Sequence, residues 1–158
     1  MDYVTDEESA ETKIIPDAAF ILANTITGRR ALFFLETDMG SERIITASIG
    51  SKQTTLHRKF SQYDRYLQSF RYQQTYQEYG EFGSFTMLFV TPQDTRIENI
   101  RREFSDLPAD LGAFYRFTTF GQALGDFLGA IWHSRLLSDT TRYPLVREES
   151  PVAVDGRG

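Results

Sequence analysis

The sequence predicts a single small α/β domain with a mixed central sheet flanked by helices. The predicted elements follow the order strand, strand, long helix, strand, helix, strand. A strand that returns through a helix to another strand favours parallel pairing with a right-handed crossover. The chain has 158 residues, of which 41% are hydrophobic and 14% aromatic, which is enough for one hydrophobic core.

The first two predicted strands cover residues 14–23 and 29–37, with a turn at 24–28 between them. The second strand contains the nearly continuous apolar run 31–35, as is typical of a strand buried on both faces. We therefore expect a hairpin at one side of the sheet.

A single helix is predicted from residue 54 to about residue 76, because its apolar residues are spaced by four, three, four and three positions. Thr54 or Thr55 can cap its first turn. The apolar stripe consists of Leu56, Phe60, Tyr63, Leu67 and Phe70.

The remaining segments complete the predicted domain, which spans residues 13–148. Residues 1–12 are expected to form a flexible acidic arm, and residues 149–158 a polar tail. The pattern of 42–49 is ambiguous between strand and helix. The other expected elements are a strand at 84–91, a helix at 95–104, a strand at 113–119, a short helix or strand at 120–132 and an edge strand near 143–146.

Composition excludes several classes of function. The chain contains no cysteine and only two histidines, so a metal site would be built from oxygen ligands suited to Mg²⁺, Mn²⁺ or Ca²⁺. The lack of cysteine fits a reducing cytoplasm, and no apolar run is long enough to span a membrane. Motifs for nucleotide triphosphates, dinucleotides and serine nucleophiles are absent. The net charge of −5 does not favour strong general binding to nucleic acid.

Three acidic residues are the main candidates for a functional site. In a hairpin, the start of the first strand lies beside the end of the second, so Asp17 is expected near Glu36 and Asp38. Carboxylates at close range repel one another unless a cation lies between them. The cluster therefore predicts a divalent metal site, while the alternative is that each acid is simply solvated at the end of a strand.

The pair Pro16-Asp17, followed by Glu36-Thr37-Asp38 on the next strand, resembles the PD-(D/E)xK nuclease superfamily. More closely, the segment 33–42, the helix with Lys59 and Tyr63, and the segment 88–91 ahead of Arg96 resemble the replication-relaxation family of plasmid and mobile-element proteins.

The resemblance to the PD-(D/E)xK superfamily implies a restriction-endonuclease-like fold and hydrolysis of phosphodiester bonds with Mg²⁺ or Mn²⁺. Asp17, Glu36 and Asp38 would hold the metal. Asp38 stands where the superfamily usually has a lysine, so Lys59 from the next helix is the candidate replacement, and either residue would position the attacking water. Thr37 is expected to point to the other face of the strand and into the core.

Arginines interleaved with aromatic residues are candidates for contact with DNA. Arg65 lies on the tyrosine-rich long helix, and Arg96 and Arg101 follow a strand at the edge where a substrate would lie. Tyrosines on such a helix can stack on bases, although they are more often part of the core. Those tyrosines are Tyr63, Tyr66, Tyr72, Tyr76 and Tyr79.

Two functions follow from these observations. The first is a metal-dependent nuclease or nuclease-like DNA-processing domain of a mobile element. The second is a catalytically inactive module that binds DNA or a protein partner in replication or conjugation. The sequence leaves the oligomeric state open, a homodimer included.

Overall fold

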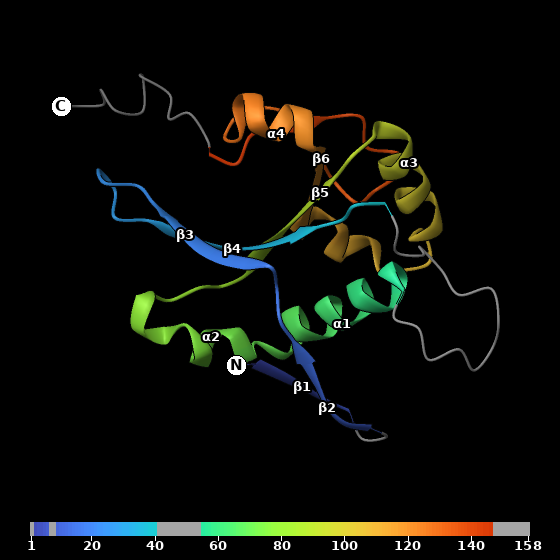
Figure 1. Ribbon diagram of the computed structural model, residues 1–158. Coiled ribbons are helices and arrows are strands. Elements are labelled where there is room, and N and C mark those ends of the chain that lie inside the picture. Colours follow the sequence, from blue (N-terminus) through green and yellow to red (C-terminus); the bar gives the residue numbers. More distant parts are fainter. Residues whose placement is uncertain (1, 7–8, 41–54, 147–158) are drawn as a thin grey trace.

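A six-stranded mixed sheet forms the centre of the computed structural model, which describes residues 2–6, 9–40 and 55–146 (Figure 1). The strands lie across the sheet in chain order; β4, β5 and β6 are mutually parallel, and the remaining neighbours pair antiparallel. The predicted α/β class is confirmed, whereas the more specific nuclease-type fold stays a prediction. The strands are β3 (Ala18–Ala23), β4 (Arg30–Thr37), β5 (Phe85–Thr91), β6 (Tyr115–Thr119), β7 (Trp132–His133) and β8 (Arg142–Tyr143).

The predicted hairpin is formed by β3 and β4, with Ala18 opposite Leu35 and Ala23 opposite Arg30. Its turn is held by the side chain of Asn24, whose Oδ1 accepts hydrogen bonds from the backbone N–H groups of Ile26 and Thr27 at 2.8 and 3.0 Å. Asparagine favours such turns because its short side chain can mimic a backbone acceptor.

Helices cover both faces of the sheet (Figure 1). Alternate residues of β4 point to opposite faces, so Phe34 belongs to the core cluster that includes residues of α1 and α3, while Phe33 belongs to the cluster that includes residues of α4. Both side chains are at most 3% exposed, which confirms a strand buried on both faces. The helical elements are α1 (Leu56–Ser69), α2 (Arg71–Thr75), η1 (Gln77–Tyr79), α3 (Asp94–Glu103), η2 (Ala109–Phe114) and α4 (Phe120–Asp126).

The prediction of one helix from 54 to about 76 is wrong in its second half. The helix ends at Ser69, and Phe70 adopts a left-handed conformation with φ of 58° before α2 begins. Phe70 is 52% exposed instead of buried on the apolar stripe, whereas Tyr72 is fully buried and donates a hydrogen bond to the carbonyl of Gly83. The break lets α2 change direction and bury Tyr72, which one straight helix would not do.

The expected flexible arm is also corrected by the structure. β1 (Asp2–Asp6) and β2 (Ser9–Ile14) form a separate antiparallel hairpin that lies beside α1 and α2 (Figure 1). Tyrosine, valine and threonine in this segment favour strands, and the acidic composition obscured that preference. Ile14 is buried in the main core and so anchors the end of the hairpin. The segments 42–49 and 149–158 lie outside the described residues.

No helix among the described residues is long and apolar enough to cross a membrane.

Candidate functional site

Two buried carboxylates mark the end of β4. Glu36 and Asp38 are two positions apart and therefore point to the same face, the face that α1 and α3 cover. They are 5% and 4% exposed. Buried carboxylates require partners, because desolvating an unpaired charge is costly. Their partners decide what this end of the sheet can do.

Glu36 is held from α1. The hydroxyl of Tyr63 donates to Oε1 of Glu36 at 2.7 Å, and Nζ of Lys59 lies 3.8 Å from Oε2. Burial, and then the charge of Glu36, raises the pKa of Tyr63 far above its usual value, so its hydroxyl remains a donor. Lys59, which the resemblance implied as a substitute lysine, does lie beside this acid.

Asp38 is held by the last residue of β5 and by residues that follow β4 and β5. Arg96 makes a two-pronged contact, with Nε 2.8 Å from Oδ2 and Nη2 3.2 Å from Oδ1. The hydroxyl of Thr91 donates to Oδ2 at 3.0 Å, and the backbone N–H of Gly40 donates to Oδ1 at 3.0 Å. An ionised carboxylate has about four lone-pair positions. All four are occupied by protein donors.

Asp17 does not join this group. Its Oδ2 accepts hydrogen bonds from the backbone N–H and the hydroxyl of Thr37, at 2.8 and 3.0 Å. The side chain of Thr37 is exposed, which corrects the expectation that it lies in the core. Thr37 is the last residue of β4, and its exposed hydroxyl is used to bind Asp17. Within the described ranges, no group of three or more acidic or histidine side chains is placed to hold a metal ion.

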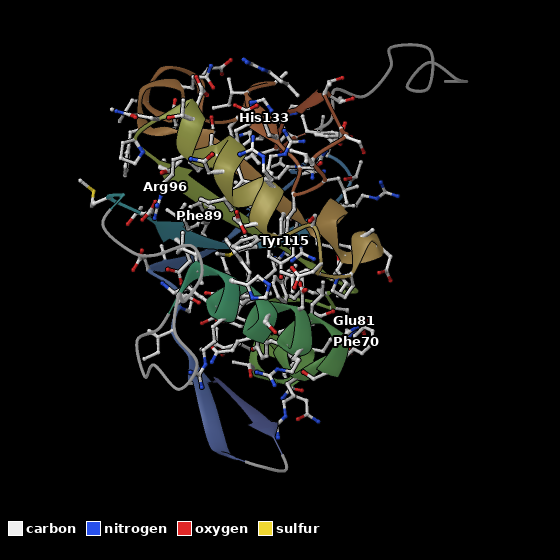
Figure 2. The ribbon with its side chains drawn as sticks, turned by 90° about the vertical axis from the view of Figure 1, so that its right-hand side faces the viewer. Phe70, Glu81, Phe89, Arg96, Tyr115 and His133 are labelled. Carbon is white, nitrogen blue, oxygen red and sulfur yellow. The ribbon has the colours of Figure 1, made fainter. Side chains whose placement is uncertain are left out.

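The three predicted nucleic-acid contacts differ in their surroundings. Arg65 is exposed on α1, and Arg96, which is labelled in Figure 2, is partly buried against Asp38. Arg101 is 8% exposed and donates to the carbonyls of Leu136 and Asp139. Burial lowers the pKa of Arg101, and the side chain faces the protein interior. We therefore do not include Arg101 in a DNA-binding surface.

The tyrosines of α1 and α2 are not available for stacking on bases. Tyr63, Tyr66 and Tyr72 are each at most 1% exposed and pack around Phe34 and Phe85 in the core. The more common interpretation of such a stripe, as core, is the correct one for these three residues.

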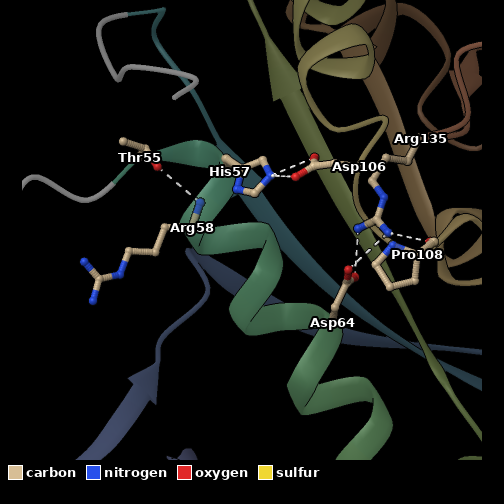
Figure 3. A network of polar contacts seen from close by, with 7 residues as sticks. All are labelled: Thr55, His57, Arg58, Asp64, Asp106, Pro108 and Arg135. Atoms are coloured by element: carbon tan, nitrogen blue, oxygen red, sulfur yellow. Dashed lines mark hydrogen bonds and ion pairs between the residues drawn. The ribbon is translucent and has the colours of Figure 1, made fainter. Parts of the chain in front are cut away.

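A buried ion pair that the sequence did not predict joins α1 to the segment after β7 (Figure 3). Nη1 and Nη2 of Arg135 lie 2.7 and 3.1 Å from the two carboxylate oxygens of Asp64. Nη2 also donates to the carbonyl of Pro108 at 3.0 Å, and the hydroxyl of Tyr115 donates to Asp64 at 2.5 Å. Asp64 occupies the buried side of α1, one position after Tyr63, which is a weak sequence signal for a buried acid. Nothing in the sequence points to Arg135, because its partner is 71 positions away.

A second contact in Figure 3 links the first turn of α1 to the loop after α3. Nε2 of His57 lies 2.9 Å from Oδ1 of Asp106. The ring of His57 also meets Phe104 edge-on, with the ring centres 5.5 Å apart. This pair is partly exposed and fixes the start of α1 to the core beneath α3.

Two surface pockets lie away from the carboxylates. One, of about 680 Å³, is lined by 28–30 of the β3–β4 turn and by 77–81. The other, of about 400 Å³, lies between 104–109 and 135–138. Glu36 and Asp38 line neither pocket and are part of a packed strand end.

The fold and this strand end define a small α/β domain in which basic residues from two helices neutralise acids at the carboxyl end of parallel strands. The model of the replication-relaxation family matches residues 3–81, which is half of the chain, and the protein belongs to that family. This membership points to a role in replication or relaxation of plasmids or other mobile elements. Searches of curated proteins and of solved structures gave no match.

Proposed function

We propose that this chain is a DNA-binding module of a plasmid or mobile-element replication and relaxation system, and that it binds DNA without cutting it. The observation that carries this proposal is the saturation of Asp38 by Arg96, Thr91 and Gly40. With four donors in place, Asp38 has no lone pair left for a metal ion or an attacking water.

The donor set as a whole does not fit a divalent metal. Mg²⁺ and Mn²⁺ need several oxygen ligands around one point. Asp17 is directed to Thr37, and Oε1 of Glu36 accepts from a tyrosine that stays protonated. Instead, Glu36 and Asp38 at the end of β4 hold the basic side chains of Lys59 and Arg96 in place near the surface.

DNA binding on this proposal depends on phosphate contacts by basic side chains. Arg58 and Arg65 are exposed on α1, and Lys59 and Arg96 are partly exposed beside the strand ends. Phosphate contacts release counterions, so affinity falls as salt rises. Because the chain carries a net charge of −5, we expect binding to be clear at low salt and weak near physiological salt.

The test combines fluorescence anisotropy with single- and double-stranded DNA over a series of salt concentrations and cleavage of supercoiled plasmid with Mg²⁺ or Mn²⁺. We expect salt-dependent binding and no nicking. Arg65→Gln should lower the affinity and reduce the salt slope by about one. The matched control is Arg142→Gln, which removes an exposed arginine from β8 at the far edge of the sheet.

A metal-dependent nuclease is the second candidate function, and one distance favours it: Nζ of Lys59 lies 3.8 Å from Oε2 of Glu36. On this alternative Asp17, Glu36 and Asp38 would be the residues that hold the metal and Lys59 the residue that orients the water, and Arg96 would have to leave Asp38. Plasmid nicking that requires Mg²⁺ or Mn²⁺ and is abolished in Glu36→Gln would establish the nuclease. No nicking together with no DNA binding at any salt would instead direct the search to a protein partner in replication or conjugation.

A further inference from the structure

The outer edge of β3 lacks the features that normally protect an edge strand from pairing with another chain. Within the part of the chain that the structure describes, β3 lies at the end of the six-stranded sheet and pairs only with β4. Its sequence is Ala-Ala-Phe-Ile-Leu-Ala, without a charge, a proline or a bulge. Natural edge strands are normally protected by such features, because an unprotected edge is a template for pairing with another strand.

The register identifies which backbone groups face outward. The N–H of Asn24 donates to the carbonyl of Arg29, which makes this a hydrogen-bonded pair of the hairpin. Hydrogen-bonded and non-hydrogen-bonded pairs alternate along an antiparallel ladder. Residues 18, 20 and 22 therefore bond to β4, and Ala19, Ile21 and Ala23 direct their N–H and C=O groups away from it.

We propose that β3 pairs antiparallel with β3 of a second copy of this chain, which joins two six-stranded sheets into one continuous sheet. A two-fold axis perpendicular to the sheet brings the same edge of both copies together. Residues that lie opposite each other in the two strands must have their side chains on the same face of the joined sheet. The axis therefore passes beside one residue of β3, either Phe20 or Ile21, and not between two residues. In either register the outward groups of one strand meet outward groups of the other.

Charge complementarity favours a second copy as the partner. The pairing segment itself is uncharged, so like charges do not oppose each other across the interface. Asp17, whose carboxylate accepts from Thr37, lies before one end of β3, and the exposed Arg29 lies beside the other end in the adjoining turn. The two ends of the edge therefore carry opposite charges, and the two-fold axis brings the acidic end of one copy toward the basic end of its partner.

Exposed apolar side chains at the two ends of β3 are consistent with this arrangement. Ile15, before the strand, is 64% exposed, and Ile26, in the turn after it, is 90% exposed. Antiparallel pairing brings the end that carries Ile15 toward the partner's end that carries Ile26. Both would lose contact with water on dimerisation, which is favourable.

The test is sedimentation velocity of the whole chain over about a hundred-fold range of concentration, wide enough to shift a two-species equilibrium by mass action. We expect a monomer–dimer equilibrium for the wild type. Ala19→Pro removes an outward N–H without touching the ladder to β4, so this variant should be monomeric with unchanged circular dichroism. Ala19→Thr keeps the N–H group and should still dimerise. A wild type that is monomeric throughout, or an Ala19→Pro variant that dimerises like the wild type, would overturn the proposal.

A crosslinking experiment decides the matter even where the proline variant fails to fold. The chain has no cysteine, so single cysteines can be introduced without competing thiols. Residues on the axis lie about 4.5–5.5 Å from their own copies across the ladder, within the range that a disulfide bridges. Phe20→Cys or Ile21→Cys should therefore form a linked dimer under mild oxidation, and Gln68→Cys, exposed on α1, should not. Linkage at neither axis position, or equal linkage at position 68, would refute β3 pairing.

Discussion

Replacing Arg135 by methionine removes the cation from the most deeply buried ion pair that the described residues contain. The side chains of Arg135 and Asp64 are 2% and 5% exposed. Methionine is apolar and of similar length, so the substitution removes the charge and its hydrogen bonds while leaving a side chain to fill the space.

The magnitude follows from what Asp64 loses. Two contacts from Arg135 disappear, and only the hydrogen bond from Tyr115 remains for a carboxylate that water barely reaches. The substitution also removes the hydrogen bond to the carbonyl of Pro108 and the guanidinium that lies 4.2 Å from the centre of the Tyr115 ring. Breaking a buried pair by removing one partner costs about 3–5 kcal/mol in unfolding free energy. A domain of this kind has about 5–15 kcal/mol in total.

Urea unfolding followed by circular dichroism measures this loss. With a urea dependence of about 1–3 kcal/mol per molar, the midpoint should fall by about 2 M. The double variant Asp64→Leu/Arg135→Met is the control, because replacing both members of a buried pair with apolar residues is often close to neutral. The reasoning is refuted if the single variant loses less than about 1 kcal/mol, or if the double variant is less stable than the single one.

Three further outcomes are expected at other positions. Tyr63→Phe removes the hydroxyl that donates to Oε1 of Glu36 and should lower the unfolding free energy by about 1–3 kcal/mol in the same urea assay; an unchanged midpoint would contradict the hydrogen bond. Burial raises the pKa of Asp139, but hydrogen bonds from Thr141, Tyr143 and Ser134 outweigh burial and lower this pKa to about 2. Because the folded pKa lies below the usual value, the stabilisation is present above pH 4 and is lost as pH falls toward 2, so thermal melts of Asp139→Asn should lack this step that the wild type shows. Phe60→Ala should cost about 3–5 kcal/mol, since the fully buried ring contacts four other aromatic rings, and a smaller loss would show that the site collapses around the gap.

The elements that the sequence predicted well are those whose signals are local. The hairpin of β3 and β4 follows from two apolar runs around a turn, and the first half of the long helix follows from its apolar spacing. The helix break at Phe70 was missed because the apolar spacing continues through it. The break instead goes with the burial of Tyr72, whose hydroxyl donates a hydrogen bond to the carbonyl of Gly83.

In the candidate site, too, the features with local signals were predicted and the long-range contacts were not. Strand alternation was enough to place Glu36 and Asp38 on one face, and the resemblance was enough to place Lys59 beside Glu36. The contact between Asp38 and Arg96 was not predicted, because it joins residues 58 positions apart and depends on where α3 begins relative to the end of β4. Such long-range polar contacts leave no periodic signal in the chain. The roles of these residues in binding or cutting DNA stay predictions.

The order of the strands has a consequence for how the chain folds as it leaves the ribosome. β4 ends at residue 37, but β5, its parallel neighbour, begins only at residue 85 and ends at residue 91. At about 5–20 residues per second, synthesis leaves the apolar β3–β4 hairpin without that neighbour for about 3–10 seconds. An isolated hairpin is at best marginally stable in water. The stretch matched by the family, which stops at residue 81, is therefore too short to complete the sheet, and a fragment cut at that boundary should aggregate instead of folding.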